Sequence, residues 1–193
     1  EARARLDASE RGLEEEDRYG TEADAAPAIG NTRVGEITIG ELPPDWEWLS
    51  GGLNRYASVF GVHFFATGNT PDDKLVRSVN VLAEYLDNDA DGLVDNEKVL
   101  QELLSVDASM IMSDTEYDLD RSLDELPERF HESVEDGDIF FAALFADEVP
   151  PNEGPDASLE EILHLITQAG YARAYPDVFG EEPGSEIANH MDV

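Results

Sequence analysis

The chain has 193 residues, of which 41% are hydrophobic, and its 45 acidic against 12 basic residues give a formal net charge of −33. This length and apolar fraction are sufficient for one sizeable domain with a hydrophobic core. So few basic residues exclude a basic patch, and we therefore expect no nucleic-acid partner and no binding to an anionic membrane surface. The absence of cysteine excludes a disulfide framework and thiolate metal sites.

Most of the acidity lies beyond residue 33. Residues 1–33 contain nine acidic and five basic residues, net −4, which leaves 36 acidic and seven basic residues, net −29, for residues 34–193. We therefore divide the chain into a charged lead-in over 1–33, disordered or helical, and a single acidic globular domain over 34–193. Such a domain resembles proteins of halophilic organisms, whose surface charge keeps them soluble in salt. An ordinary acidic secreted protein, partly neutralised by divalent ions, is the alternative.

Short strands and one long helix are predicted for the first half of this domain. Alternating apolar residues predict a strand over 34–39 and another over 59–67, and a proline pair between them precedes an aromatic patch at Trp46 and Trp48. The hydroxyl of Thr70, followed by a proline and two acids, predicts the start of a helix. The apolar stripe of this helix is formed by Leu75, Val79, Leu82 and Leu86.

The most specific motif of the chain follows this helix. In an EF-hand loop, carboxylates at positions 1, 3 and 5 bind calcium, a glycine at position 6 permits a sharp turn, and position 7 offers its carbonyl oxygen. These places are filled by Asp87, Asp89, Asp91, Gly92 and Leu93, and position 9 is Asp95. A chain of this composition contains D-x-D-x-D-G by chance only about 0.02 times. We therefore interpret the loop as a calcium site rather than as a solvated acidic turn.

A second apolar-periodic segment, from Val99 to Leu104, follows the loop and predicts a second helix. Residues 71–106 thus resemble an EF-hand, and the resemblance implies a calcium-binding loop at 87–98. Position 12, where an EF-hand has a bidentate glutamate, is Lys98. We therefore expect a structural or low-affinity calcium site, not a sensor. A weak site is useful where calcium is abundant, which favours a secreted protein, extracellular or at the cell surface.

The second half of the domain again combines strands and helices. We expect a strand around 108–112, a polar helix over 120–134, a buried strand over 138–145 and a helix over 158–169 that stops at Gly170. No apolar run is long enough to span a bilayer. The loose alternation predicts a single α+β or α/β domain with a small mixed sheet, several helices and one helix-loop-helix.

The helix over 158–169 contains an alternative site. Its segment from Glu160 to His164 has the form E-E-x-x-H, which resembles the H-E-x-x-H motif of zincin metallopeptidases with glutamate in place of the first histidine. The resemblance implies that Glu160, His164 and Glu186 hold zinc and that Glu161 is the general base. The same residues also have structural uses, because Ser158 with Glu161 forms a capping box and Glu160 with His164 forms an ordinary surface pair.

The sequence supports two alternative functions. The first is a secreted or surface-associated calcium-binding protein, halophile-adapted, in which the ion joins two helices and has no catalytic part. The second is a zincin-like metallohydrolase that uses the residues of the E-E-x-x-H segment. The residues identify neither a substrate nor a protein partner, and they leave self-assembly open.

Overall fold

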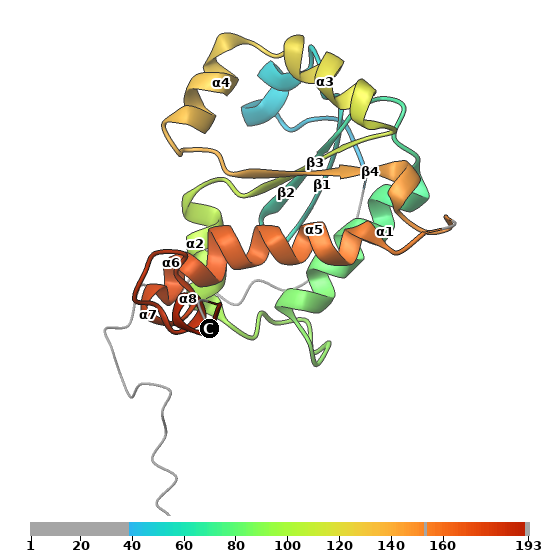
Figure 1. The fold of residues 1–193 in the computed structure, drawn as a ribbon. Helices are drawn as coiled ribbons and strands as arrows, with labels where there is room; N and C mark the ends of the chain where they lie inside the picture. The colour runs from blue at the N-terminus through green and yellow to red at the C-terminus, as the bar shows by residue number, and fades with distance from the viewer. Residues whose placement is uncertain (1–38, 153, 192–193) are drawn as a thin grey trace, which may run out of the picture. The chain divides into compact units, whose positions relative to one another are not determined.

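A four-stranded sheet with helices on both faces organises the domain (Figure 1). The computed structural model describes residues 39–152 and 154–191. The strands are β1 (Arg55–Val59), β2 (Val62–Ala66), β3 (Ser109–Ser113) and β4 (Phe141–Phe145), in the spatial order β1-β2-β3-β4. β1 pairs with β2 antiparallel, whereas β2 with β3 and β3 with β4 are parallel. The predicted lead-in over 1–33 and nearly all of the predicted strand over 34–39 lie outside the described residues.

A tight hairpin connects the first two strands. Val59 pairs with Val62, and the two residues between them, Phe60 and Gly61, have φ angles of 52° and 86°. A two-residue hairpin turn of this kind places both central residues in the left-handed region, which glycine adopts readily and phenylalanine rarely. The predicted single strand over 59–67 was therefore wrong at its start, because the turn carries no Asn-Gly or Asp-Gly signal.

Side chains alternate between two apolar layers, one on each face of the sheet. Val62 and Phe64 pack into one layer and Phe65 into the other, which confirms the alternation predicted for this strand. The first layer is covered by α1 (Asp72–Leu86), α2 (Glu97–Ser105) and α5 (Ala157–Leu165). The second is covered by the 3₁₀-helix η1 (Pro44–Leu49), α3 (Glu116–Asp124) and α4 (Glu128–Glu135). The predicted mixed α+β fold in one compact domain is confirmed.

The two parallel connections cross opposite faces of the sheet. The chain passes from β2 to β3 through α1 and α2 on the first face, and from β3 to β4 through α3 and α4 on the second. Both connections step in the same direction across the sheet, so they have opposite hands. Because about 98% of parallel crossovers are right-handed, one of these two is an exception to that rule.

The C-terminal helices continue from α5 without the predicted stop at Gly170. A π-helix η3 (Ile166–Tyr171) and α6 (Ala172–Ala174) follow directly, and α7 (Pro176–Phe179) and α8 (Glu186–Met191) end the described part. A Cβ added to Gly170 would lie 2.8 Å from the Val99 side chain on α2. This glycine therefore serves close helix packing rather than helix termination.

Three further boundaries differ from the prediction. The polar helix predicted over 120–134 is two helices, because Pro127 is the extended N-cap residue of α4 and separates it from α3. Thr70 does not cap α1, since its buried hydroxyl donates to the carbonyl of Met112. The N-cap of α5 is Asp156, not Ser158. In the part of the chain that the structure describes, no helix is long and apolar enough to cross a membrane.

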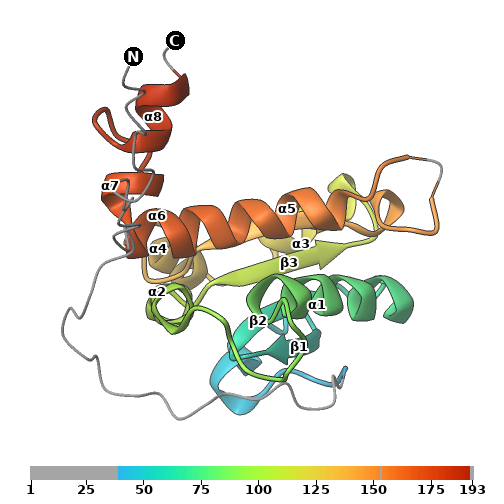
Figure 2. The same ribbon diagram turned by 90° about the horizontal axis from the view of Figure 1, so that it is seen from below.

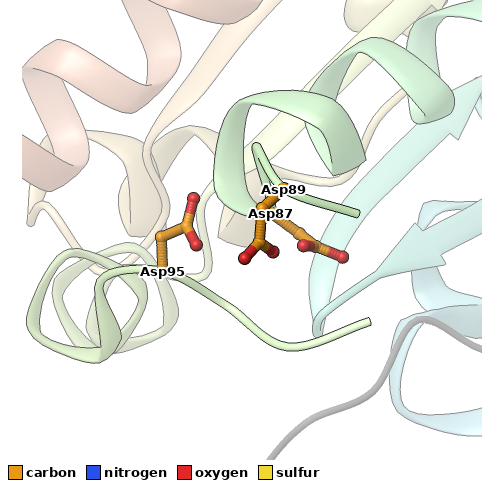
Figure 3. A group of neighbouring side chains, drawn as sticks. All are labelled: Asp87, Asp89 and Asp95. Carbon is orange, nitrogen blue, oxygen red and sulfur yellow. The ribbon is translucent and has the colours of Figure 1, made fainter. Parts of the chain in front are cut away.

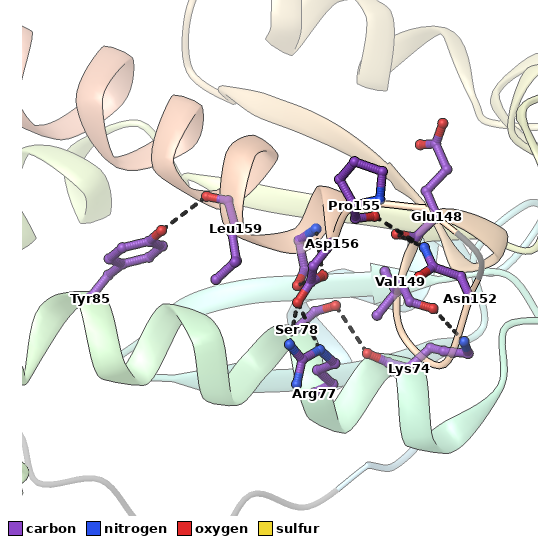
Figure 4. Close-up of polar contacts among 11 residues, drawn as sticks. Lys74, Arg77, Ser78, Tyr85, Glu148, Val149, Asn152, Pro155, Asp156 and Leu159 are labelled. Carbon is purple, nitrogen blue, oxygen red and sulfur yellow. Dashed lines mark hydrogen bonds and ion pairs between the residues drawn. The ribbon is translucent and has the colours of Figure 1, made fainter.

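Polar contacts join α1 to the segment that leads into α5, and the two helices lie side by side (Figures 2 and 4). Arg77 donates from Nε to the Asp156 carboxylate at 2.9 Å, and the ammonium of Lys74 donates to the carbonyl of Pro151 at 3.0 Å. Further along α1, the hydroxyl of Tyr85 donates to the carbonyl of Leu159 at 3.1 Å. These contacts hold α1 beside α5, and they thereby set the direction in which the C-terminal end of α1 leads into the acidic loop.

Candidate metal site in the loop between α1 and α2

The acidic loop lies between two helices, as predicted. α1 ends at Leu86 with Asp87 as its C-cap, and α2 begins at Glu97 after the N-cap Asn96. The side chain of Asn96 accepts a hydrogen bond from the Val99 amide at 3.2 Å, which satisfies one of the unpaired N–H groups at the start of α2. Both ends of the loop are thus held by regular helix-end contacts.

Backbone geometry folds the loop back on itself. Ala90 and Gly92 have φ angles of 56° and 86°, and glycine is the residue that adopts the second value without steric cost. The amide of Asp95 donates to the carbonyl of Leu86 at 2.8 Å, which closes the loop at its base. The turn permitted by Gly92 brings residues at the two ends of the loop close together.

Three carboxylates meet inside this turn (Figure 3). One oxygen from each of Asp87, Asp89 and Asp95 lies within 4.8 Å of the others, a spacing that could hold a metal ion. Asp87 is only 6% exposed, whereas the other two carboxylates are exposed. Across residues 39–152 and 154–191, this is the one group of three acidic or histidine side chains that meets that spacing.

Loop amides orient the three carboxylates. Asp87 accepts from the amides of Asp91 at 3.1 Å and Gly92 at 2.8 Å, and Asp95 accepts from the amide of Asn88 at 2.9 Å. Asp89 accepts from the amide of Asp91 at 3.2 Å. Each carboxylate has about four lone-pair positions, so these bonds leave acceptor capacity for a cation.

The predicted ligand Asp91 and the position-12 residue Lys98 both lie apart from this carboxylate group. The carboxylate of Asp91 accepts a hydrogen bond from the Leu93 amide at 2.8 Å, and Asp91 is not part of the three-carboxylate group. Lys98, at the twelfth position, points to the C-terminal segment, where its ammonium lies 4.6 Å from the centre of the Tyr175 ring. Asn96 and the hydroxyl of Tyr175 also contact each other at 3.2 Å. Lys98 is thus used in packing, and it offers no oxygen to the loop.

A small cavity adjoins the loop. It has a volume of about 200 Å³ and is lined by Asn88, Asp95 and Asn96 from the loop and by Tyr85 and Tyr171 from the neighbouring helices. A water molecule occupies about 30 Å³ of liquid volume, so the cavity has room for several waters. Asp95 borders both this cavity and the carboxylate group, so an ion bound between the carboxylates would have solvent available for further coordination.

The residues of the E-E-x-x-H segment lie on an exposed part of the molecule. Glu160 and His164 are exposed on α5, and Glu186 is exposed at the start of α8. The close contact is between His164 and Glu161, whose Nδ1 and Oε2 atoms are 3.6 Å apart. Glu160, His164 and Glu186 do not form a three-ligand group in the described residues.

Comparison with known proteins found no matching family model, no similar curated protein and no similar solved structure. The class of this protein therefore follows from its fold and its candidate site alone. It is a mixed α+β domain in which three aspartates of an interhelical loop are close enough to bind a metal ion.

Proposed function

We propose that this protein is a calcium-binding protein whose loop 87–95 holds a structural ion in an EF-hand-like manner. The observation that carries the proposal is the convergence of Asp87, Asp89 and Asp95 within 4.8 Å on a loop whose backbone is already folded around them. The ion joins the end of α1 to the start of α2. Its binding energy adds to the free energy of unfolding, because the unfolded chain does not hold the three carboxylates together.

The donor set favours calcium among the common metal ions. All three side chains offer oxygen, the ligand that hard cations prefer, and no imidazole or thiolate accompanies them. Calcium accepts six to eight oxygens in flexible geometry, so loop carbonyls and waters can complete the shell, whereas magnesium demands a near-ideal octahedron. With Lys98 in place of a bidentate glutamate, the affinity is low, in the range of extracellular modules.

A weak structural site fits surroundings that are rich in calcium or in salt. We therefore propose a secreted or surface-associated protein, and a halophilic source fits the net charge of −33. Salt screens the repulsion among the acidic side chains, and calcium neutralises the part of it that the loop concentrates.

The proposal is tested by a calcium titration of thermal stability. The purified protein is first freed of divalent ions and then melted at calcium concentrations from micromolar to tens of millimolar. A calcium concentration of 100 times Kd adds about 2.7 kcal/mol, which raises the Tm by about 5–11 °C in a domain of this size. The variant Asp95→Asn removes one carboxylate of the group and is expected to lose most of this rise. An unchanged Tm at tens of millimolar calcium would refute the proposal.

The zincin-like alternative makes a different prediction. If Glu160, His164 and Glu186 held zinc with Glu161 as general base, zinc would copurify with the protein and would be lost in His164→Ala. Metal analysis of the purified protein and of this variant decides between the two functions. The calcium titration is unaffected by His164→Ala if the loop is the site.

A further inference from the structure

The start of helix α2 contacts the C-terminal segment, residues 172–191, as well as the acidic loop. Asn96, the N-cap of α2, directly follows Asp95, one of the three carboxylates of the candidate metal site. The side-chain amide of Asn96 donates to the hydroxyl of Tyr175 at 3.2 Å. The ammonium of Lys98 lies 4.6 Å from the centre of the same tyrosine ring. Tyr175 is therefore held by two residues at the end of α2 that adjoins the metal site.

Other residues of α2 support the same part of the chain. Nε of Arg173, on α6, lies 3.7 Å from Oε2 of Glu102. Just before α6, a Cβ added to Gly170 would lie 2.8 Å from the side chain of Val99. Helix α2 is thus the surface against which the chain packs where it leaves η3 for the C-terminal segment.

The C-terminal segment buries few side chains of its own. Among the described residues from 172 to 191, Ala174 and Ser185 are the buried ones, and neither lies in α7 or α8. Helix α8 packs on α7, and the two helices lie beyond α6 at one end of the molecule (Figure 2). Segments with few buried apolar contacts open locally at a lower free energy than global unfolding requires. Docking of this segment is therefore a local equilibrium that contacts at Tyr175 can shift.

Docking favours a cation in the loop for two reasons. The contact between Tyr175 and Asn96 restrains the neighbouring Asp95, so the three carboxylates stay close together. The contact between Tyr175 and Lys98 keeps the ammonium at the ring, whereas a released ammonium could approach the loop and oppose a second positive charge there. A ligand that binds the docked state better also shifts the protein toward that state.

We propose that docking of the C-terminal segment regulates the calcium site, with Tyr175 as the contact that couples the two. This inference rests on the function proposed for the loop 87–95. Calcium holds α6, α7 and α8 against α2, and loss of calcium loosens them. Lys98, at the position where an EF-hand supplies its bidentate glutamate, binds the segment instead of the ion. The coupling is expected to be about tenfold in affinity, within the usual range for linked sites.

Calorimetric titration with calcium at 25 °C tests the coupling from the side of the ion. Tyr175→Ala removes both contacts without changing the charge of the loop, and it is expected to raise the Kd for calcium about tenfold. Tyr175→Phe keeps the ring beneath Lys98 and loses only the hydroxyl, so a smaller increase is expected. Gly52→Ala is the control for general destabilisation, because its Cβ would clash with Ser122 in the other apolar layer. This variant should bind calcium with the parent's Kd.

Hydrogen exchange tests the coupling from the side of the segment. The exchange of the amides in α7 and α8 is measured in EDTA and in saturating calcium, for the parent and for Tyr175→Ala. Because linkage is reciprocal, calcium should slow this exchange in the parent by a factor similar to the change in Kd. In Tyr175→Ala the exchange should be fast in EDTA, and calcium should slow it much less than in the parent.

The two proposals fail in different ways. A parent protein that does not bind calcium would refute the function proposed for the loop, and the coupling with it. Calcium binding with the same Kd in the parent, Tyr175→Ala and Tyr175→Phe would overturn the coupling alone. Exchange in α7 and α8 of the parent that does not respond to calcium would do the same. An equal loss of affinity in Gly52→Ala would also overturn it, because general destabilisation would then explain the effect.

Discussion

Replacing Asp89 by asparagine is expected to stabilise the calcium-free protein while weakening its response to calcium. In Asp89→Asn the new side chain keeps an oxygen that can accept the hydrogen bond from the Asp91 amide, which spans 3.2 Å in the parent protein. What the variant loses is one negative charge in the three-carboxylate group. Its effect on stability therefore isolates the repulsion within the group.

The size of that repulsion follows from the spacing of the carboxylates. Charges 4.8 Å apart repel by about 0.9 kcal/mol in a medium with the dielectric constant of water. Asp89 takes part in two of the three pairs, which gives about 1.7 kcal/mol before screening. At 0.15 M salt the Debye length of about 8 Å reduces this to about 1 kcal/mol, and at 1 M salt to about 0.3 kcal/mol. Without calcium, the Tm should therefore rise by about 2–4 °C at the lower salt concentration.

The assay compares melting curves of the parent protein and Asp89→Asn at both salt concentrations, in chelator and in calcium. Calcium should reverse the order of stability, because the variant offers the ion one charge less. Asp120→Asn, exposed on α3, changes the net charge equally and leaves the loop intact, so it should shift stability by only a few tenths of a kcal/mol. If calcium-free Asp89→Asn were no more stable than the Asp120→Asn control, the repulsion argument would be wrong.

Three further changes test the packing and polar contacts that hold the helices in place. Gly52→Ala should lower the free energy of unfolding by about 2–3 kcal/mol, because its Cβ would lie 2.0 Å from the Ser122 carbonyl oxygen, whereas Gly40→Ala, with open space, should change little in the same denaturant titration. Tyr175→Phe removes the hydroxyl that contacts Asn96 and should cost about 1 kcal/mol in that titration, while calcium still raises the Tm. The pKa of Asp156 is lowered below 3.8, since bonds from Ser158 and Arg77 outweigh the opposing effect of burial. Its stabilising contribution, measured against Asp156→Asn, should thus be complete at neutral pH and disappear as the pH falls through that lowered pKa; a difference that stayed constant from neutral pH down to acid unfolding would contradict this reasoning.

The predictable parts of the fold are those with strong local signals. The stripe from Leu75 to Leu86 and the D-x-D-x-D-G motif place α1 and the acidic loop correctly, because helix periodicity and turn chemistry are encoded within a few residues. The hairpin at Phe60 was missed, because its left-handed conformation is imposed by strand pairing and not by a turn residue. Gly170 looked like a helix stop, but it is glycine because α2 approaches it closely.

The candidate sites likewise combine features that the local sequence predicts with features that depend on long-range packing. Sequence spacing identified Asp87, Asp89 and Asp95 as neighbours, since all three lie on one short loop. It could not show that Lys98 turns to Tyr175, because that contact joins residues far apart in the chain. Trp46 and Trp48 were visible as an aromatic patch, yet their association with Arg129 depends on the packing of α4 against η1. Long-range packing of this kind leaves no local pattern in the sequence.

The opposite hands of the two crossovers have a consequence for where ligands can enter. Since the chain leaves β2 toward one face and β3 toward the other, a crevice would be expected at the carboxyl ends of these strands, the usual binding position in open α/β sheets. At these ends the Thr67 amide and the Thr70 hydroxyl both donate to the carbonyl of Met112, at 3.0 and 3.2 Å, so the loop after β2 is tied to the end of β3. A cavity of about 550 Å³ lies at the amino ends of β3 and β4, so a ligand bound in it would approach the sheet from the edge opposite to that usual position.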